Sequence, residues 1–236
     1  MSNPLLLNYH DAVLYQSDLN ILESPRVWLN DACMNFVLTR LGKEFASRCR
    51  FVDPSVLSFF MHQWDEEEDG DEDVLGLKRP QDDGSTLFLF LPINDNYVSQ
   101  NWTNPGGGTH WSLLLLAMEK KKDGSQFWHF DSSAGSNQRA ALAVAQKIQR
   151  VMNHHPKHPM EECTAPQQQN GYDCGLHTLA TARALAMAFS SGEENKFRKD
   201  TLEDIVRQTV ATSPSFFSKM RQAMVQDIQS LIQEDS

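Results

Sequence analysis

Cys174 is the residue of this sequence best placed to act as a nucleophile. It follows Asp173 in the segment "QQQNGYDCG", directly before a run of apolar and small residues that predicts a helix. A thiol at a helix N-terminus lies near free backbone N–H groups and the positive end of the helix dipole, which stabilise its thiolate. The same position also suits a small apolar residue that only packs. Other residues must distinguish these two interpretations.

A cysteine nucleophile needs a base, and the base needs a group that orients it. His110 begins a predicted strand directly after "PGGGT", and Asp131 ends the next predicted strand. A short turn containing Asp123 and Gly124 joins these strands, so we expect them to run antiparallel. His110 and Asp131 should therefore lie at the same end of a hairpin, where an imidazole–carboxylate pair could form.

An oxyanion formed during acyl transfer requires hydrogen-bond donors. Gln167, Gln168 and Gln169 precede Cys174 in a predicted loop and carry side-chain N–H groups, and the backbone N–H of Cys174 is a second donor. Each of these signals alone more often reflects a structural role. The order His, Asp, Gln, Cys along one chain is far more specific and favours a hydrolase with a cysteine nucleophile.

The elements that must position these residues indicate an α+β protein. A small central sheet, built largely from hairpins, is flanked by helices. Predicted strands cover 85–95, 109–118 and 127–133. Predicted helices cover 24–45, 54–64 with Asp53 as the cap, 137–152 with Ser136 as the cap, 174–189, 195–210 and 215–233.

Length and charge limit the class of protein. The 236 residues fit one domain, 1–236, and the net charge of −10 argues against nucleic acid as a partner and suits a basic polypeptide better. We expect neither a signal peptide nor a membrane span, because the first residues lack a basic region and the apolar runs are short. Four scattered cysteines favour a reducing compartment, the cytoplasm or nucleus.

An acidic block, "DEEEDGDED", opens a segment rich in Gly, Pro and Asp. Such a block repels itself and stays solvated, so we expect a mobile surface loop at about 65–84. The alternative is a docking patch for a basic partner.

The remaining thiols and imidazoles are more simply explained by packing. Cys33 lies on an apolar helical stripe, and Cys49 follows the same region. A set of three histidines and one cysteine offers ligands that zinc could use, but these residues lack the sequence spacing usual in zinc sites, so we expect no metal site. That set is His154, His155, His158 and Cys163, whereas His129 and His177 are expected to be structural.

Three segments carry a family resemblance. "GTHWSLL", "FWHFDSS" and "PQQQNGYDCG" resemble the signature segments of the Ulp-type cysteine proteases, which remove ubiquitin-like modifiers. The upstream segments "LNYHDAVLYQSDLNILESPRVWLND" and "FLPINDN" are closer to the deneddylase branch than to the desumoylating branch. The resemblance covers about residues 5–190. It implies a papain-related, adenain-like α+β fold with a small central mixed sheet.

The resemblance assigns roles to matching positions. Cys174 would be the nucleophile, His110 the base and later the acid, and Asp131 the group that orients His110. Gln168 matches the oxyanion-hole glutamine better than its two neighbours do.

In this family two tryptophans roof a narrow tunnel for the Gly-Gly tail of the modifier, and Trp28 and Trp111 occupy those positions. Neighbouring strand residues face opposite sides, so core packing is a serious alternative for Trp111. Asn30 and Asp31 also match the motif. They could contact the tail or merely cap the first long helix.

The resemblance implies a thiol isopeptidase that removes a Nedd-type modifier from lysines and trims its precursor after the terminal Gly-Gly. Its partners would be the modifier and its conjugates, such as neddylated cullins, and we expect a monomer that needs no cofactor. Three alternatives stay open. They are a SUMO-specific protease with the same machinery, an acyltransferase, and a catalytically idle domain that only binds a modifier.

Overall fold

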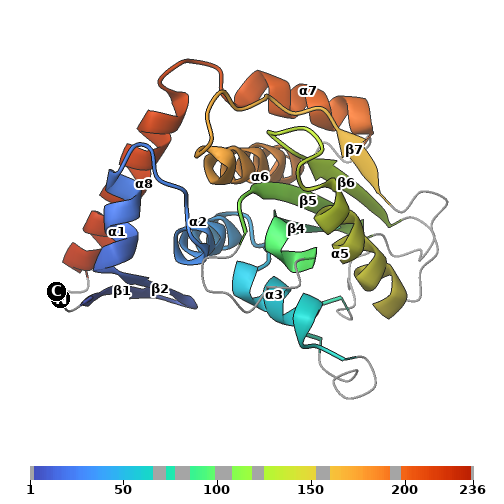
Figure 1. Ribbon diagram of the computed structural model, residues 1–236, viewed down its shortest axis with the longest axis horizontal. Helices are drawn as coiled ribbons and strands as arrows, with labels where there is room; N and C mark the ends of the chain where they lie inside the picture. The colour runs from blue at the N-terminus through green and yellow to red at the C-terminus, as the bar shows by residue number, and fades with distance from the viewer. Residues whose placement is uncertain are drawn as a thin grey trace.

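The structure is a computed structural model in which a central sheet is enclosed by helices (Figure 1). Most of the predicted acidic loop at 65–84 lies outside the described residues, as do His154, His155 and His158. No helix among the described residues has the length and apolar character needed to cross a membrane. The described residues are 3–65, 73–77, 86–98, 108–118, 125–152, 160–191 and 198–234.

The central sheet has five strands in the order β3-β4-β5-β6-β7. Its three middle strands pair antiparallel, which confirms the predicted hairpins, whereas both outer strands pair parallel with their neighbours. The outer strands have only three residues each, too few for a visible hydrophobic pattern. The sheet is therefore mixed. Its strands are β3 (Cys49–Phe51), β4 (Leu87–Asn94), β5 (Trp111–Met118), β6 (Gln126–Phe130) and β7 (Glu161–Cys163).

Alternate residues of β4 and β5 pack on opposite faces of the sheet. Phe88 and Leu113 contact a core formed with α6 (Cys174–Ser190) and α7 (Lys199–Thr209). Leu89 and Leu114 contact a second core, formed with α3 (Pro54–His62), α5 (Gln138–Val151) and the short η1 (Asp95–Val98). Both strands are buried on both faces, which explains their nearly continuous apolar sequences.

A third core joins the two ends of the chain. The hairpin of β1 (Leu5–Tyr9) and β2 (Ala12–Tyr15) leads into α1 (Gln16–Glu23), which packs against the C-terminal helix α8 (Phe216–Glu234) (Figure 1). The helix α2 (Asp31–Glu44) lies between this unit and the sheet. The Arg40 guanidinium donates two hydrogen bonds of 2.8 Å to Asp227 and so links α2 to α8.

Gly175 allows the start of α6 to approach α2 closely. A Cβ atom at this position would lie 3.1 Å from Leu29 Cβ and 3.2 Å from Met34 Sδ. Both distances are tighter than ordinary van der Waals contact, so a larger residue would displace its neighbours. The glycine after Cys174 is therefore required by packing.

The structure confirms one predicted helix start and corrects two others. Asp53 caps α3 as predicted, accepting a hydrogen bond of 2.7 Å from the Ser55 N–H. The prediction that Ser136 caps α5 is wrong, because the N-cap residue is Asn137 and the Ser136 hydroxyl bonds to Ser133 instead. The predicted helix at 24–45 begins only at Asp31, where α2 starts.

Candidate active site

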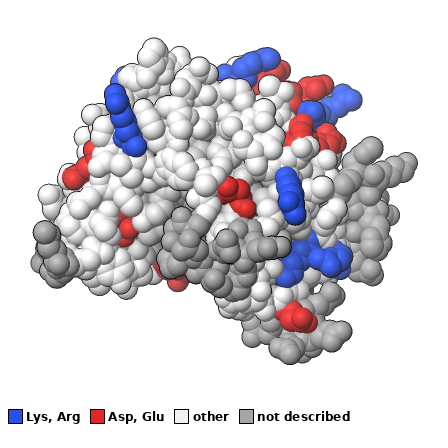
Figure 2. All heavy atoms as spheres, in the orientation of Figure 1, with Lys and Arg blue, Asp and Glu red and all other residues white. Residues whose placement is uncertain are grey.

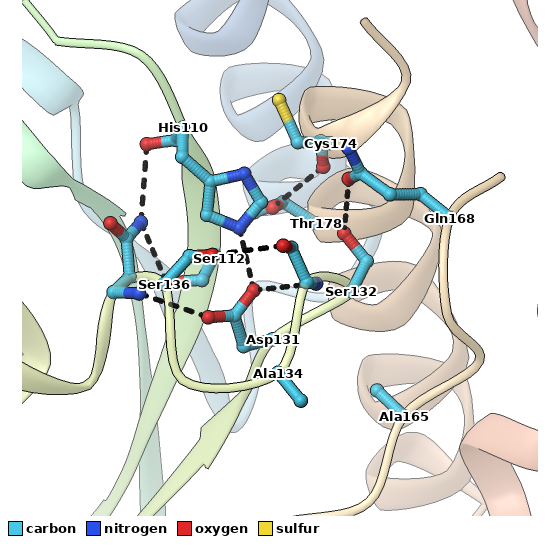
Figure 3. Close-up of polar contacts among 12 residues, drawn as sticks. His110, Ser112, Asp131, Ser132, Ala134, Ser136, Ala165, Gln168, Cys174 and Thr178 are labelled. Atoms are coloured by element: carbon cyan, nitrogen blue, oxygen red, sulfur yellow. Dashed lines mark hydrogen bonds and ion pairs between the residues drawn. The ribbon is translucent and has the colours of Figure 1, made fainter. Parts of the chain in front are cut away.

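His110 and Asp131 lie at the same end of the β5–β6 hairpin, as the sequence predicted. Leu113 pairs with Phe130 in this hairpin, so Asp131 directly follows β6 while His110 directly precedes β5. His110 Nε2 lies 2.5 Å from Asp131 Oδ1, and both side chains are buried (Figure 3). Such a contact orients the imidazole ring and stabilises its protonated form.

The carboxylate of Asp131 is held by backbone donors from the following loop. Its Oδ1 accepts a 2.9 Å bond from Ser133 N–H, and its Oδ2 accepts a 3.0 Å bond from Asn137 N–H. Burial alone would raise the pKa of Asp131, but the hydrogen bond with His110 and these two N–H groups outweigh it. The pKa of Asp131 is consequently lowered.

His110 lies between a carboxylate and the candidate nucleophile. Cys174 is the first residue of α6, and Figure 3 shows it beside the His110 ring, away from the edge that faces Asp131. Burial lowers the pKa of His110, but hydrogen bonds with Asp131 and Cys174 and the charges of both groups outweigh it and raise the pKa to about 9. The ring is therefore cationic near neutral pH. A cationic imidazole beside a thiol favours the thiolate.

Gln168 is the member of the glutamine run that reaches the side of Cys174 (Figure 3). Its backbone N–H donates to Ser132 O at 2.8 Å, and its Oε1 accepts a 2.8 Å bond from the Ser132 hydroxyl. Its Nε2 donates to Asn170 O at 2.7 Å, which uses one of two N–H groups. The amide is thus oriented by its surroundings.

The other two glutamines make different contacts. Gln167 Nε2 donates to Asp131 O at 3.0 Å, and its Oε1 accepts a 2.9 Å bond from Ala134 N–H. Gln169 is exposed and donates to the backbone of Gln167. Gln167 therefore ties the loop before Cys174 to the loop after β6.

Trp28 lies across the loop that leads to Cys174. Its indole N–H donates to Gly171 O, and 40% of its surface is exposed. The segment that carries Trp28 is held from behind by Arg221 of α8, whose guanidinium donates to Ile21 O at 3.1 Å and to Val27 O at 2.5 Å. Arg221 is buried, and no pattern in the sequence predicted this role.

Trp111 is packed rather than open to solvent. Only 4% of its surface is exposed, and its indole N–H donates to Leu29 O at 2.9 Å. It belongs to the same core cluster as Cys174. Trp111 is therefore packed in the core, as the alternative interpretation expected. Its hydrogen bond to Leu29 also connects it to the segment that carries Trp28.

Asn30 and Asp31 lie at the start of α2. Asn30 is the N-cap, since its Oδ1 accepts a 3.0 Å bond from Cys33 N–H, and its Nδ2 donates to Asp18 Oδ1 at 2.7 Å. Asp31 is exposed, in the first turn of the helix. Desolvation and then the nearby charge of Asp53 raise the pKa of Asp31.

A pocket of about 1230 Å³ is lined by the loop before Cys174, the end of α1, the residues before α8 and α8 itself. Asp173 and His177 contribute to its wall, and the His177 ring contacts Phe217 with ring centroids 4.3 Å apart and the ring planes tilted by 43°. Burial and then the charge of His110 lower the pKa of His177 to about 4. Figure 2 shows few charged side chains over α1 and α8, whereas charges gather over α7.

All four cysteines are buried, and Cys174 is the one that lies beside His110. Cys33 and Cys49 are buried, and burial raises the pKa of each to about 12. Burial likewise raises the pKa of Cys163. His129 is fully buried and hydrogen-bonded at both ring nitrogens, as expected of a structural histidine. The residues that the structure describes contain no group of three or more ligands arranged for a metal ion.

Comparison with known proteins identifies the family of this chain. The Ulp1 protease family, C-terminal catalytic domain, matches residues 27–221. This chain belongs to that family. The chain is 33% identical to NEDD8-specific protease 1 of Arabidopsis thaliana. The alignment covers 97% of this chain and 94% of the relative. The chain is 31% identical to human sentrin-specific protease 8, with 93% of each chain covered.

Solved structures agree on the fold. A structure of the SUMO protease Ulp1 with its catalytic cysteine oxidised to a sulfinic acid superposes with a TM-score of 0.59, at 20% identity, over 97% of this chain and 90% of Ulp1. The predicted papain-related α+β fold is therefore confirmed, and this Ulp1-family chain is a cysteine protease.

Proposed function

We propose that this Ulp1-family protease is a thiol isopeptidase that removes a Nedd-type modifier from lysines and trims the modifier's precursor after its terminal Gly-Gly. The observation that carries the chemistry is the buried His110–Asp131 pair, 2.5 Å apart, beside Cys174 at the start of α6. We propose that Gln168 completes the set of four side chains that carry out acylation and deacylation.

In the acylation step, the Cys174 thiolate attacks the carbonyl carbon of the modifier's last glycine and forms a C–S bond. The negative charge moves to the carbonyl oxygen, which accepts hydrogen bonds from the Gln168 amide and the Cys174 backbone N–H. As the C–N bond breaks, His110 gives its proton to the lysine amine. A thioester and a free amine result.

In the deacylation step, His110 accepts a proton from a water molecule that attacks the thioester. The C–S bond then breaks, the modifier leaves with a free carboxylate, and the thiolate is restored. Asp131 keeps the imidazole oriented through both steps. This cycle needs neither a metal ion nor another cofactor.

The tail of the modifier would approach Cys174 beside Trp28. The exposed indole of Trp28 lies across Gly171, while Trp111 supports the same segment from beneath through Leu29. A tail that passes so close to an indole suits glycine, because a Cβ atom would meet the ring. Asp31 is a candidate partner for a basic tail residue, and Asn30 supports it as the cap of α2.

The Nedd-type assignment is supported by two relatives that match nearly full length, named NEDD8-specific protease 1 and sentrin-specific protease 8. The partners would be the Nedd-type modifier and its conjugates, such as neddylated cullins. We propose that the protease acts as a monomer in the cytoplasm or nucleus.

Cleavage of C-terminal fluorogenic conjugates of Nedd-type, SUMO-type and ubiquitin modifiers tests this proposal. We expect wild type to cleave the Nedd-type conjugate preferentially and Cys174→Ala to bind it without turnover. A preference for the SUMO-type conjugate would support the proposed thiol mechanism but contradict the proposed Nedd-type specificity. Cleavage by Cys174→Ala would overturn the chemistry, and tight binding without turnover by wild type would indicate an idle binding domain.

A further inference from the structure

Asn137 occupies a helix N-cap position but does not cap the helix. Asparagine is favoured at N-caps because its side-chain oxygen accepts a bond from the first turn. Here the side chain makes no such bond and is completely buried. Its Oδ1 has no hydrogen-bond partner among the described residues, although a buried amide oxygen is unfavourable without one. Helix capping therefore does not explain the asparagine.

The side chain instead holds the strand ends that carry His110. Asn137 Nδ2 lies 3.1 Å from each of three acceptors: Ile93 O, His110 O and Ser112 Oγ. The backbone N–H of the same residue donates to Asp131 Oδ2 at 3.0 Å. One residue thus contacts the main chain of His110 and the carboxylate of Asp131. A flipped amide would place its oxygen against three acceptors, so the orientation is determined.

A second chain of hydrogen-bond contacts reaches the Ser112 hydroxyl from His129 and Glu162. Glu162 can only accept, so His129 Nδ1, 2.9 Å from Glu162 Oε2, carries the proton. The other ring nitrogen, Nε2, lies 2.8 Å from Ser112 Oγ. Ser112 Oγ keeps a lone pair for Asn137. The half-exposed Glu162 on β7 is therefore the outer end of a chain that reaches Asn137.

We propose that Asn137 is a positioning residue for the hydrolysis, kept in its working orientation by the Ser112–His129–Glu162 chain. The proposal rests on the proposed function, because its kinetic readout is modifier cleavage. Asn137 contacts no reacting atom. It acts by keeping His110 at the distance from Asp131 and Cys174 that proton transfer requires.

Four titratable groups face His110, and each could shift its pKa. Asp131 follows β6, Cys174 and His177 belong to α6, and Asp95 of η1 accepts a 3.2 Å bond from His110 N–H. Replacing Asn137 removes none of these groups. A change in the titration of His110 would therefore report a change in its position.

The first test compares Asn137→Ala with Ser136→Ala, which removes an exposed hydroxyl from the same turn. We expect Asn137→Ala to lower kcat by about tenfold to a hundredfold at a nearly unchanged KM, because a small misplacement of a catalytic group has effects of this size. Ser136→Ala should match wild type. Glu162→Gln, which weakens the outer end of the chain, should give a smaller loss of kcat.

The second test follows the His110 ring by NMR across a pH titration. We expect Asn137→Ala to lower the His110 pKa from about 9 toward its ordinary value, because the contact with Asp131 loosens. A lower melting temperature with unchanged kcat and an unchanged His110 titration would overturn the proposal and leave Asn137 a purely structural role. If Asn137→Ala does not fold, Asn137→Ser, which adds no charge beside His110, takes its place.

These readouts separate two kinds of failure. If wild type cleaves no modifier, the proposed function is wrong, and the titration of His110 still decides the role of Asn137. If wild type cleaves and Asn137→Ala is as active as wild type, only the positioning role is wrong.

Discussion

The two sides of the candidate site are built in different ways. On one side, His110 directly precedes β5, Asp131 directly follows β6, and both side chains lie in a buried hydrogen-bond network. On the other side, Trp28 lies on an irregular segment with 40% of its surface exposed, and is held by Gly171 and by the anchoring of its segment to Arg221. The first side is rigid and suited to proton transfer, while the second offers an apolar surface that a bound chain could cover. Substitutions on the two sides should therefore change different kinetic constants.

The largest effect is expected on the hairpin side. His110→Ala should lower kcat by about 10⁴-fold, since the base and acid are lost together. Asp131→Asn should lower kcat by about a hundredfold, because the imidazole remains but loses its charged partner. Steady-state cleavage of the Nedd-type conjugate measures both. Equal losses would show that Asp131 does more than orient His110.

Substitutions of the two tryptophans should have different effects: one mainly on substrate affinity, the other mainly on the stability of the fold. Trp28→Ala should raise KM by about tenfold or more with a smaller change in unfolding free energy than Trp111→Ala, because Trp28 is 40% exposed and Trp111 only 4%. Trp111→Ala should destabilise the fold by about 3–5 kcal/mol, as expected for a buried tryptophan. Urea unfolding and cleavage kinetics on both variants provide the comparison. A KM unchanged in Trp28→Ala would remove that residue from the tail-binding surface.

The raised pKa of His110 predicts a pH dependence of stability. The folded-state pKa of about 9 lies above the ordinary value of 6.5. The stabilisation is therefore fully present below pH 6.5 and is lost as the pH rises through about 9. Urea unfolding between pH 6 and 10 should show a decline for wild type that is smaller in Asp131→Asn. Parallel curves would mean that the pair does not raise the pKa of His110.

The smallest effect is expected at the contact between the two sides. In Gly175→Ala the new methyl group would press on Leu29 Cβ at 3.1 Å, next to Trp28, while the helix itself gains about 1 kcal/mol of propensity. Overpacking costs about 1–3 kcal/mol, so we expect a net destabilisation of about 1 kcal/mol. Gly171→Ala, with nothing within 4 Å of the new atom, is the control for urea unfolding. A more stable Gly175→Ala variant would show that α6 and residue 29 adapt freely.

Short-range signals predicted the hairpin side well. The strands of His110 and Asp131 are joined by a short connection, so alternation and turn residues sufficed to place the two side chains together. The same local reasoning failed at the start of α5. It assigned the cap to Ser136, because a sequence does not show that the Asn137 side chain turns into the site rather than toward its helix.

Long-range contacts were beyond such reasoning. Arg221 reaches Val27 across 194 positions of the chain, and Trp28 reaches Gly171 across 143. The parallel outer strands β3 and β7 were missed for a related reason, since their partners come from distant segments and their three residues carry no pattern.

The sequence by itself determined which groups are available for chemistry, their order, and the α+β class. Residue type sets acid, base and nucleophile, and hydrophobic periodicity sets helix and strand. The family resemblance already favoured Gln168 over its neighbours, whereas only the tertiary structure decided that Trp111 is packed and that Asn137 joins His110 to Asp131. The physical reason is that burial and hydrogen-bond partners depend on segments that meet only when the three cores assemble.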